Sequence, residues 1–208
     1  MSNFSICFDR QLGSGGREIA GAVANELGFR FLDKEIIALA AEHGNLSKDT
    51  AESIDEKPTT SLLYSVVTNT AHYTAGGLGY NVPINDKLYI AQTEVIKDIA
   101  SKENAVFVGR CSDHILAKDP HALSVFIYAN DDFRAERVMN SEGCDKKKAL
   151  DIIAKGDKKR ASYYNFYTGK KWGAMQYYDL CVNSSLLGIE GTAKLIADFA
   201  RKFMDAHR

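Results

Sequence analysis

Cysteine and proline are scarce in this chain of 208 residues, and their scarcity excludes several kinds of protein. The four cysteines lie far apart, so no Cys-x-x-Cys motif for a metal ion or a redox disulfide exists. They are Cys7, Cys111, Cys144 and Cys181. Cys7 and Cys181 lie in apolar runs, where a small buried thiol is the usual role, and we expect a reduced, cytoplasmic protein. Only three prolines occur, which argues against a flexible linker and favours one domain over residues 1–208.

An excess of one charge and a long apolar run are missing as well. The formal net charge is −1, so the composition favours neither a nucleic acid polymer nor a membrane surface as a partner. No apolar run reaches the roughly 18 residues of a membrane span. The first residues also do not have the basic and then apolar layout of a signal peptide. The five histidines are scattered, and none has a partner at metal-ligand spacing.

The most informative feature that is present is an apolar run leading into a glycine-rich turn. Residues 4–9 read Phe-Ser-Ile-Cys-Phe-Asp, and residues 10–20 read Arg-Gln-Leu-Gly-Ser-Gly-Gly-Arg-Glu-Ile-Ala. A strand, a glycine loop and a helix N-terminus together form an anion site, because the glycines let backbone N–H groups turn inward and the helix end adds partial positive charge. We therefore expect a ligand that carries phosphate.

Five apolar runs predict strands, and helical patterns separate them. The predicted strands are Phe4–Phe8, Phe29–Leu32, Ala105–Val108, Leu123–Tyr128 and Leu180–Val182. Short, continuous, β-branched runs are typical of parallel strands that are buried on both faces. The predicted helices are Gly16–Leu27, Asp33–Ala41, Ile84–Ala100 and Ile189–Ala206. Strands alternating with helices predict an α/β fold with a parallel sheet.

Two segments interrupt this alternation. Residues 44–83 are long and polar, with a glycine-rich stretch at 74–80, and predict an inserted helical subdomain with a mobile tip. Residues 131–177 combine basic residues with aromatic ones and resemble a lid that closes on phosphates. The aromatic residues there, among them Tyr163, Tyr164 and Trp172, could stack on a base, but lid packing or the contact of a homodimer is the more common role at such spacings.

The order and spacing of several motifs resemble the cytidylate kinase-like family of P-loop nucleoside monophosphate kinase relatives. The motifs are the glycine loop at 10–19, Phe31–Ile37, Val106–Asp113, Arg134 with Arg137, Asp157–Arg160 and Tyr178–Asn183. The resemblance runs nearly end to end. It implies a three-layer α/β P-loop core with a five-stranded parallel sheet in the order 2-3-1-4-5. It also implies a nucleoside-monophosphate-binding insertion at 44–83, a lid at 131–177, and transfer of the γ-phosphoryl group of ATP to CMP or dCMP.

The resemblance assigns the glycine loop to the phosphates of ATP. The residues concerned are Gly13, Ser14, Gly15, Gly16, Arg17 and Glu18. Arg17 would take over the role of the P-loop lysine, displaced by one position; a solvated arginine on the first helical turn is the alternative. Arg134 and Arg137 stand three residues apart on one helical face and would contact ATP, unless they belong to a solvated face.

Three further residues are assigned to the acceptor nucleotide. Asp33 follows the second strand, where an N-cap role is the alternative. Arg110 follows the third strand, at the strand edge where α/β proteins bind ligands, and a surface ion pair is the alternative. Arg160, in the predicted lid, would reach the acceptor phosphate. Arginine suits these places because its guanidinium group grips phosphate oxygens bidentately. We expect Arg17, Arg134, Arg137 and Arg160 to act in catalysis.

The chain departs from the strict P-loop pattern G-x-x-x-x-G-K-[ST] at the residues that bind magnesium. Gly16 stands at the lysine position, Glu18 at the serine or threonine, and Val108 where an acidic residue is expected. The usual Mg²⁺ ligands are therefore absent, with Glu18 a weak substitute and Asp9 a candidate acting through water. Binding of ATP thus follows more directly than its turnover. A catalytically weak nucleotide-binding sensor, or a phosphotransferase for another small phosphorylated metabolite, is the alternative function.

Overall fold

One parallel sheet organises the protein. The computed structural model describes residues 3–57 and 82–207. The strands are β1 (Ser5–Arg10), β2 (Arg30–Leu32), β3 (Ala105–Val108), β4 (Ala122–Tyr128) and β5 (Leu180–Asn183). They pair in parallel in the order β2-β3-β1-β4-β5, which confirms the predicted order. β1 runs past its predicted end at Phe8 to Arg10, so that two charged residues end the central strand.

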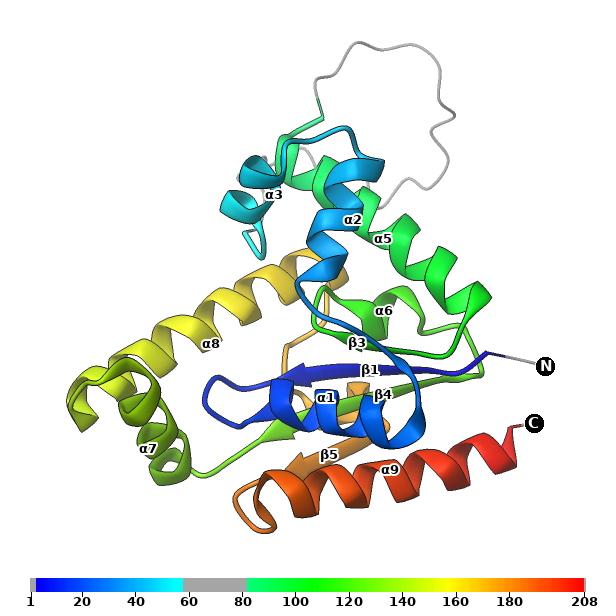
Figure 1. Ribbon diagram of the computed structural model, residues 1–208. Coiled ribbons are helices and arrows are strands. Elements are labelled where there is room, and N and C mark those ends of the chain that lie inside the picture. The colour runs from blue at the N-terminus through cyan, green and yellow to red at the C-terminus, as the bar shows by residue number, and fades with distance from the viewer. Residues whose placement is uncertain (1–2, 58–81, 208) are drawn as a thin grey trace.

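Helices cover both faces of this sheet (Figure 1). The helices within the described residues are α1 (Gly16–Leu27), α2 (Glu35–His43), α3 (Lys48–Ile54), α5 (Ile84–Lys102), α6 (Ser112–Ile115), α7 (Asp131–Glu142), α8 (Lys146–Thr168) and α9 (Gly188–Ala206), with a 3₁₀ turn at Met175–Tyr177. α1 ends at the residues predicted for it, where Gly28 in the left-handed conformation caps it. The apolar periodicity therefore located the long helices of the core correctly.

The core lies on the two sides of β1, whose six residues are all buried. On one side, α1 and α9 pack their apolar stripes against the sheet, with Ile19, Val23 and Ile196 fully buried. On the other side, α5 contributes Ile96 to a second cluster that also contains the buried Cys7 thiol, whose pKa burial raises. A sheet covered on both faces explains why its strands are continuous apolar runs.

The segment 131–177 forms a helical hairpin whose second helix is joined to the core. α7 and α8 pack on each other and extend beyond the sheet edge in Figure 1. The C-terminal half of α8 buries three tyrosines, and each tyrosine hydroxyl donates a hydrogen bond to a side chain of α5 or α6. The bonds run from Tyr163 to Gln92, from Tyr164 to Asp113 and from Tyr167 to Asp86. This part of the aromatic cluster is therefore packing within the chain.

The segment 44–83 is only partly described. It contains α3, which Ser47 caps by accepting a hydrogen bond from the backbone N–H of Thr50. The glycine-rich stretch at 74–80 lies outside the described residues.

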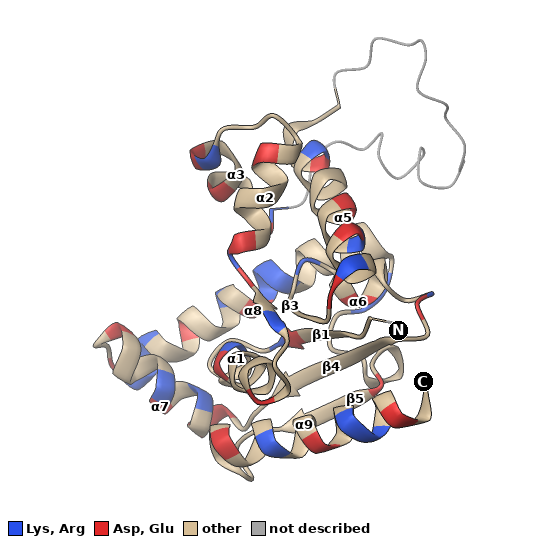
Figure 2. Cartoon of the chain, turned by 45° about the vertical axis from the view of Figure 1, so that its right-hand side comes forward, with Lys and Arg blue, Asp and Glu red and all other residues tan. Residues whose placement is uncertain are grey.

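Within the described ranges, none of the helices is both long and apolar enough to cross a lipid bilayer. Acidic and basic side chains alternate along α9 in Figure 2, and neither sign dominates the visible face.

The parallel strands bring their carboxyl ends to one edge of the sheet. Asp9 and Arg10 end β1, Gly109 and Arg110 follow β3, and Asp33 follows β2. Residues of Gly109-Arg110-Cys111 all have positive φ angles, between 56° and 73°. Left-handed backbone at two successive non-glycine residues is rare and marks a turn whose shape its surroundings impose. This edge is the expected place for a ligand.

Candidate active site

The glycine loop is closely enclosed by its neighbours. A Cβ atom at Gly13, where φ is +80°, would lie 2.8 Å from the backbone oxygen of Arg134. A Cβ atom at Gly16 would lie 2.4 Å from the Cβ of Arg10. Ser14 is buried, and its carbonyl oxygen accepts a hydrogen bond of 2.6 Å from Ser184, which follows β5. Glycine is required here both for the backbone turn and for space.

Arg134 fixes the glycine loop to the helical hairpin. Its Nε donates to the carbonyl oxygen of Leu12 at 2.8 Å, and its guanidinium group forms a short ion pair with Asp157 of α8. Asp157 also accepts a hydrogen bond of 2.7 Å from the backbone N–H of Leu12. The side chain of Arg134 is 5% exposed. Arg134 is therefore positioned to hold the loop, and its guanidinium is already occupied.

Two other predicted phosphate-binding arginines form ion pairs at the outer side of α1. Arg17 Nε donates to Asp33 Oδ2 at 2.5 Å, which joins one predicted ATP residue to one predicted acceptor residue. Arg137 forms a short ion pair with Glu18. Arg17 and Glu18 remain mostly exposed, with 63% and 60% of their side-chain surface accessible. The predicted loop residues thus lie together around the N-terminus of α1.

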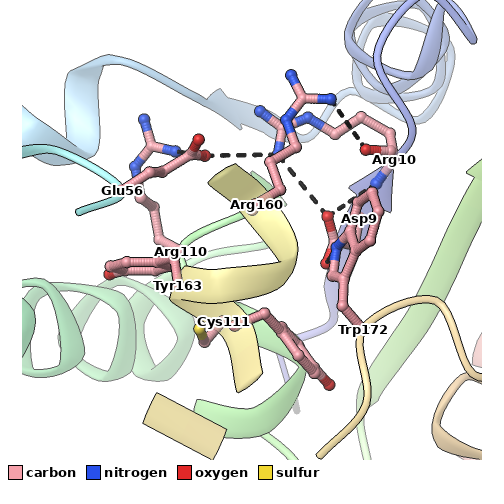
Figure 3. A pocket seen from close by; sticks show the side chains of 10 residues that line it. Asp9, Arg10, Glu56, Arg110, Cys111, Arg160, Tyr163 and Trp172 are labelled. Atoms are coloured by element: carbon pink, nitrogen blue, oxygen red, sulfur yellow. Dashed lines mark hydrogen bonds and ion pairs between the residues drawn. The ribbon is translucent and has the colours of Figure 1, made fainter. Parts of the chain in front are cut away.

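A second group of residues lines a pocket at the end of β1 (Figure 3). Asp9 and Arg10 come from β1, Arg110 from the turn after β3, Arg160 from α8 and Glu56 from the residues after α3. Side chains nearly fill this pocket, leaving about 10 Å³. Two predicted acceptor-binding residues, Arg110 and Arg160, therefore meet across it, although they are 50 residues apart in sequence.

Arg110 is buried and is held by two consecutive carboxylates. Its Nη2 donates to Asp55 Oδ2 at 2.7 Å, and its Nη1 forms a short hydrogen bond with Glu56. Burial opposes ionisation of Glu56, but the positive charges of Arg110 and Arg10 prevail and lower its pKa. Burial raises the pKa of Asp55 despite the attraction of Arg110. These carboxylates occupy the guanidinium nitrogens that would bind an acceptor phosphate.

Arg160 differs from the other arginines of the site. It donates to the carbonyl oxygen of Arg10 at 3.0 Å, and it forms no ion pair with any described residue. Burial, together with the nearby charge of Arg10, lowers its pKa to about 10. Burial and Arg10 outweigh the attraction of Glu56, Asp9 and Asp157, so the charge of this guanidinium is only partly balanced, and an anion beside it would stabilise it. The pocket therefore favours an anionic ligand beside Arg160.

Asp9 faces the same pocket under an aromatic cover. Its Oδ2 accepts a hydrogen bond of 2.7 Å from Trp172 Nε1 and a longer one of 3.4 Å from the hydroxyl of Tyr178. Its Oδ1 accepts from the backbone N–H of Arg10 at 2.8 Å. Burial raises the pKa of Asp9 to about 6, against the lowering effect of Arg10. Trp172 is the sole tryptophan of the chain and lines the pocket, so its fluorescence can report on the site.

Comparison with known proteins identifies the family. The model of the cytidylate kinase-like family matches residues 5–186, which covers both the glycine loop and the pocket. The chain belongs to the cytidylate kinase-like family. No curated protein matches it in sequence.

Two solved structures support the fold of this family member. An uncharacterized protein from Eubacterium ventriosum ATCC 27560 is 27% identical, with 96% of this chain and 99% of that chain covered and a TM-score of 0.70. Shikimate kinase from Bacteroides thetaiotaomicron is 14% identical, with 95% and 98% covered and a TM-score of 0.52. The second likeness shows the fold alone, which is that of the P-loop kinases.

The family implies ATP and Mg²⁺, and the residues that the structure describes do not fit a metal held directly by protein oxygens. Glu18 stands at the usual ligand position but is ion-paired with Arg137. The Asp9 oxygens already accept hydrogen bonds from Trp172 and from the backbone of Arg10. Within 3–57 and 82–207, groups of three or more His, Cys, Asp or Glu side chains that could hold a metal ion do not occur. This disagrees with the usual P-loop arrangement, in which protein oxygens ligate Mg²⁺.

Sequence reasoning about this family member missed the acidic half of the site. Asp55 and Glu56 are acidic residues in a polar segment, where a solvated side chain is the usual interpretation, and Asp157 was noted only as part of the motif Asp157–Arg160. Their contacts follow from no local pattern, because their arginine partners lie 23 to 55 residues away. Trp172 was considered only as a stacking or packing residue, whereas its indole N–H binds Asp9 across 163 positions.

Proposed function

We propose that the protein is an ATP-dependent kinase that transfers the γ-phosphoryl group to CMP or dCMP. The observation that carries this proposal is the pocket in which Arg110 and Arg160 meet beside the glycine loop. Membership of the cytidylate kinase-like family supports it. In this proposal the loop residues 13–18 bind the phosphates of ATP, and the pocket binds the acceptor phosphate.

The reaction requires two anionic substrates to be aligned and the charge of the moving phosphoryl group to be balanced. Arg160 lines the pocket, and its guanidinium donates a hydrogen bond to the carbonyl oxygen of Arg10, the residue that leads into the glycine turn. It would stabilise charge on the transferred group. Arg110 would orient the acceptor phosphate, and Trp172 with Tyr163 and Tyr164 would exclude water from the pocket. Arg17 and Arg137 would contact the ATP phosphates after leaving Asp33 and Glu18.

A catalytically weak nucleotide-binding sensor is the second candidate. The ion pair between Glu18 and Arg137 favours it, because this pair occupies the position at which kinases of this fold usually hold their metal. A kinase for another small phosphorylated metabolite is the third candidate. All three bind a phosphate-bearing ligand and differ in turnover and acceptor.

The deciding experiment is calorimetry with ATP, CMP, dCMP, AMP and UMP, with and without Mg²⁺, followed by a coupled assay of ADP release. Binding of CMP or dCMP with ADP release supports the cytidylate kinase. ATP binding without turnover with any of these acceptors favours the sensor, and turnover restricted to AMP or UMP assigns a different acceptor.

A matched pair of variants tests the role of Arg110. Arg110→Lys keeps a positive charge beside Asp55 and Glu56 but removes the bidentate fork. We expect CMP affinity to fall at least 10-fold while ATP affinity stays unchanged. Arg201→Lys on α9, which pairs with Glu26 far from the pocket, is the control. CMP affinity that is unchanged in Arg110→Lys would contradict the assignment.

A further inference from the structure

The ion pairs of Arg110 are unusual in number and burial. One guanidinium group holds two carboxylates from adjacent residues, Asp55 and Glu56. The side chains are 4%, 15% and 12% exposed, so both negative charges are largely removed from water. Arg110 Nε is buried and has no hydrogen-bond partner among the described residues. Arg110 alone would need only one carboxylate as its counter-ion. Glu56 is shared with Arg10, whose Nη1 lies 3.7 Å from Glu56 Oε1, and burying both carboxylates beside Arg110 costs free energy.

The backbone on both sides of this contact is constrained as well. Glu56 has φ +51° and Arg110 has φ +56°, and both are non-glycine residues in the left-handed region. The carboxylates lie after the end of α3, whose last residue is Ile54, while Arg110 lies between β3 and α6. Such strain at one contact is a feature of ligand sites and switches.

One oxygen of Glu56 and one of Asp55 bind the two Nη atoms of Arg110, as two oxygens of a single phosphate group would. Two ionised carboxylates carry a charge of −2, which is close to the −1.5 to −2 of a phosphomonoester at pH 7. The pocket leaves about 10 Å³, roughly the space of one water molecule. A phosphate group therefore cannot reach Arg110 while both carboxylates stay in place.

We propose that Asp55 and Glu56 form an internal ligand of Arg110, which a doubly charged phosphomonoester displaces when it binds. The pair thereby determines specificity, because a neutral alcohol or a singly charged phosphodiester cannot replace both negative charges. This inference rests on the proposed role of Arg110 in acceptor binding and defines the acceptor class as phosphomonoester dianions.

The test measures binding without ATP, through the fluorescence of Trp172. The probes are CMP, inorganic phosphate, and the methyl phosphodiester of CMP as a singly charged analogue. Asp55→Asn with Glu56→Gln removes the competing charges, so the affinity for CMP or inorganic phosphate should rise at least 10-fold. The preference for CMP over its methyl ester should shrink by a similar factor. Glu52→Gln on the exposed face of α3 is the matched control, with no change expected.

Unchanged or weaker binding of both dianionic probes by the double variant would overturn the proposal, because the carboxylates would then not compete with the ligand. Glu56→Gln alone, which keeps one ion pair, should bind the dianionic probes several-fold more tightly and serves if the double variant does not fold. Hydrogen exchange of the wild-type protein gives an independent result. Binding should speed exchange in residues 48–57, whereas protection there would contradict displacement.

These outcomes are separable from the proposed function. ADP release is not part of the binding test, so a protein without turnover can still show the displacement. If inorganic phosphate shows the expected change and CMP does not bind, the cytidylate acceptor is wrong and the displacement still holds. If CMP is phosphorylated and the double variant gains no affinity, the kinase holds and the displacement is wrong.

Discussion

The ion pairs at the outer side of the glycine loop differ from those on its inner side. At the outer side, Arg17 pairs with Asp33 and Arg137 with Glu18, and at least one partner of each pair is largely exposed. On the inner side, Arg110 and Arg134 are almost fully buried with their carboxylates. Exposed pairs contribute little to stability and are easily exchanged, whereas breaking one partner of a buried pair is costly. The outer pairs can therefore yield to a nucleotide, and the inner pairs fix the loop or restrict what enters the pocket.

The largest effect is the expected difference in stability between variants of Arg134 and Arg137, which stand three residues apart on α7. Arg134→Met leaves the carboxylate of Asp157 without its partner and should destabilise the fold by about 3 to 5 kcal/mol. Arg137→Met breaks only the partly exposed pair with Glu18 and should cost below about 1 kcal/mol. Denaturant unfolding measures both values.

A third variant controls for the origin of the Arg134 effect. Adding Asp157→Asn to Arg134→Met removes the stranded charge and should recover part of the loss. Equal destabilisation by Arg134→Met and Arg137→Met would refute the distinction between inner and outer pairs.

Arg160→Gln should lower activity without lowering stability, unlike changes at the buried ion pairs of Arg110 and Arg134. Arg160 forms no ion pair with a described carboxylate. The repulsion from Arg10 that its removal relieves offsets the lost attraction to Glu56 and Asp9, so the free energy of unfolding should change by less than about 1 kcal/mol. Turnover should fall about 100-fold or more, as when one donor to a developing anion is removed. Kinetics and thermal unfolding of the same preparation provide the comparison. Strong destabilisation together with normal turnover would make Arg160 a structural residue.

The smallest effect is the pH dependence that Asp9 causes. Its pKa of about 6 in the fold is raised from 3.8, so its contribution to stability is present below pH 3.8 and is lost as the pH rises through 6. Between pH 5 and pH 8 this amounts to about 1 to 2 kcal/mol. The stability of the wild type relative to Asp9→Asn should therefore fall by that amount over this range.

Thermal unfolding at several pH values measures this difference, and Asp98→Asn at an exposed position of α5 is the control. A difference between wild type and Asp9→Asn that does not vary with pH would show that Asp9 titrates normally.

The fold could be predicted well from the sequence, because helices and strands follow from local patterns. Ile19 and Val23 recur at helical spacing, and the run Ala105–Val108 is continuous and β-branched; the structure has both elements with the predicted bounds. The order of the strands came from the family resemblance and is confirmed. The residues of the glycine loop follow from the same local signals, and they do lie around the N-terminus of α1.

The partners of the site residues could not be predicted in the same way. Arg110 was expected at the strand edge and lies there, but its contacts with Asp55 and Glu56 depend on how α3 packs. Arg134 and Arg137 look equivalent in sequence, yet one is buried against Asp157 and the other pairs at the surface with Glu18. Whether these arginines take part in catalysis stays a prediction.

The sequence by itself determined the α/β architecture and the glycine loop, because periodicity, β-branching and glycine act over a few neighbouring residues. Only the tertiary structure decided which charges are neutralised and which are not. Burial and distance between segments more than 20 residues apart set those energies, and a linear pattern does not contain them. Thus the contrast between Arg110, which pairs with two carboxylates, and Arg160, which pairs with none of the described ones, became visible only when the strands, α3 and α8 came together.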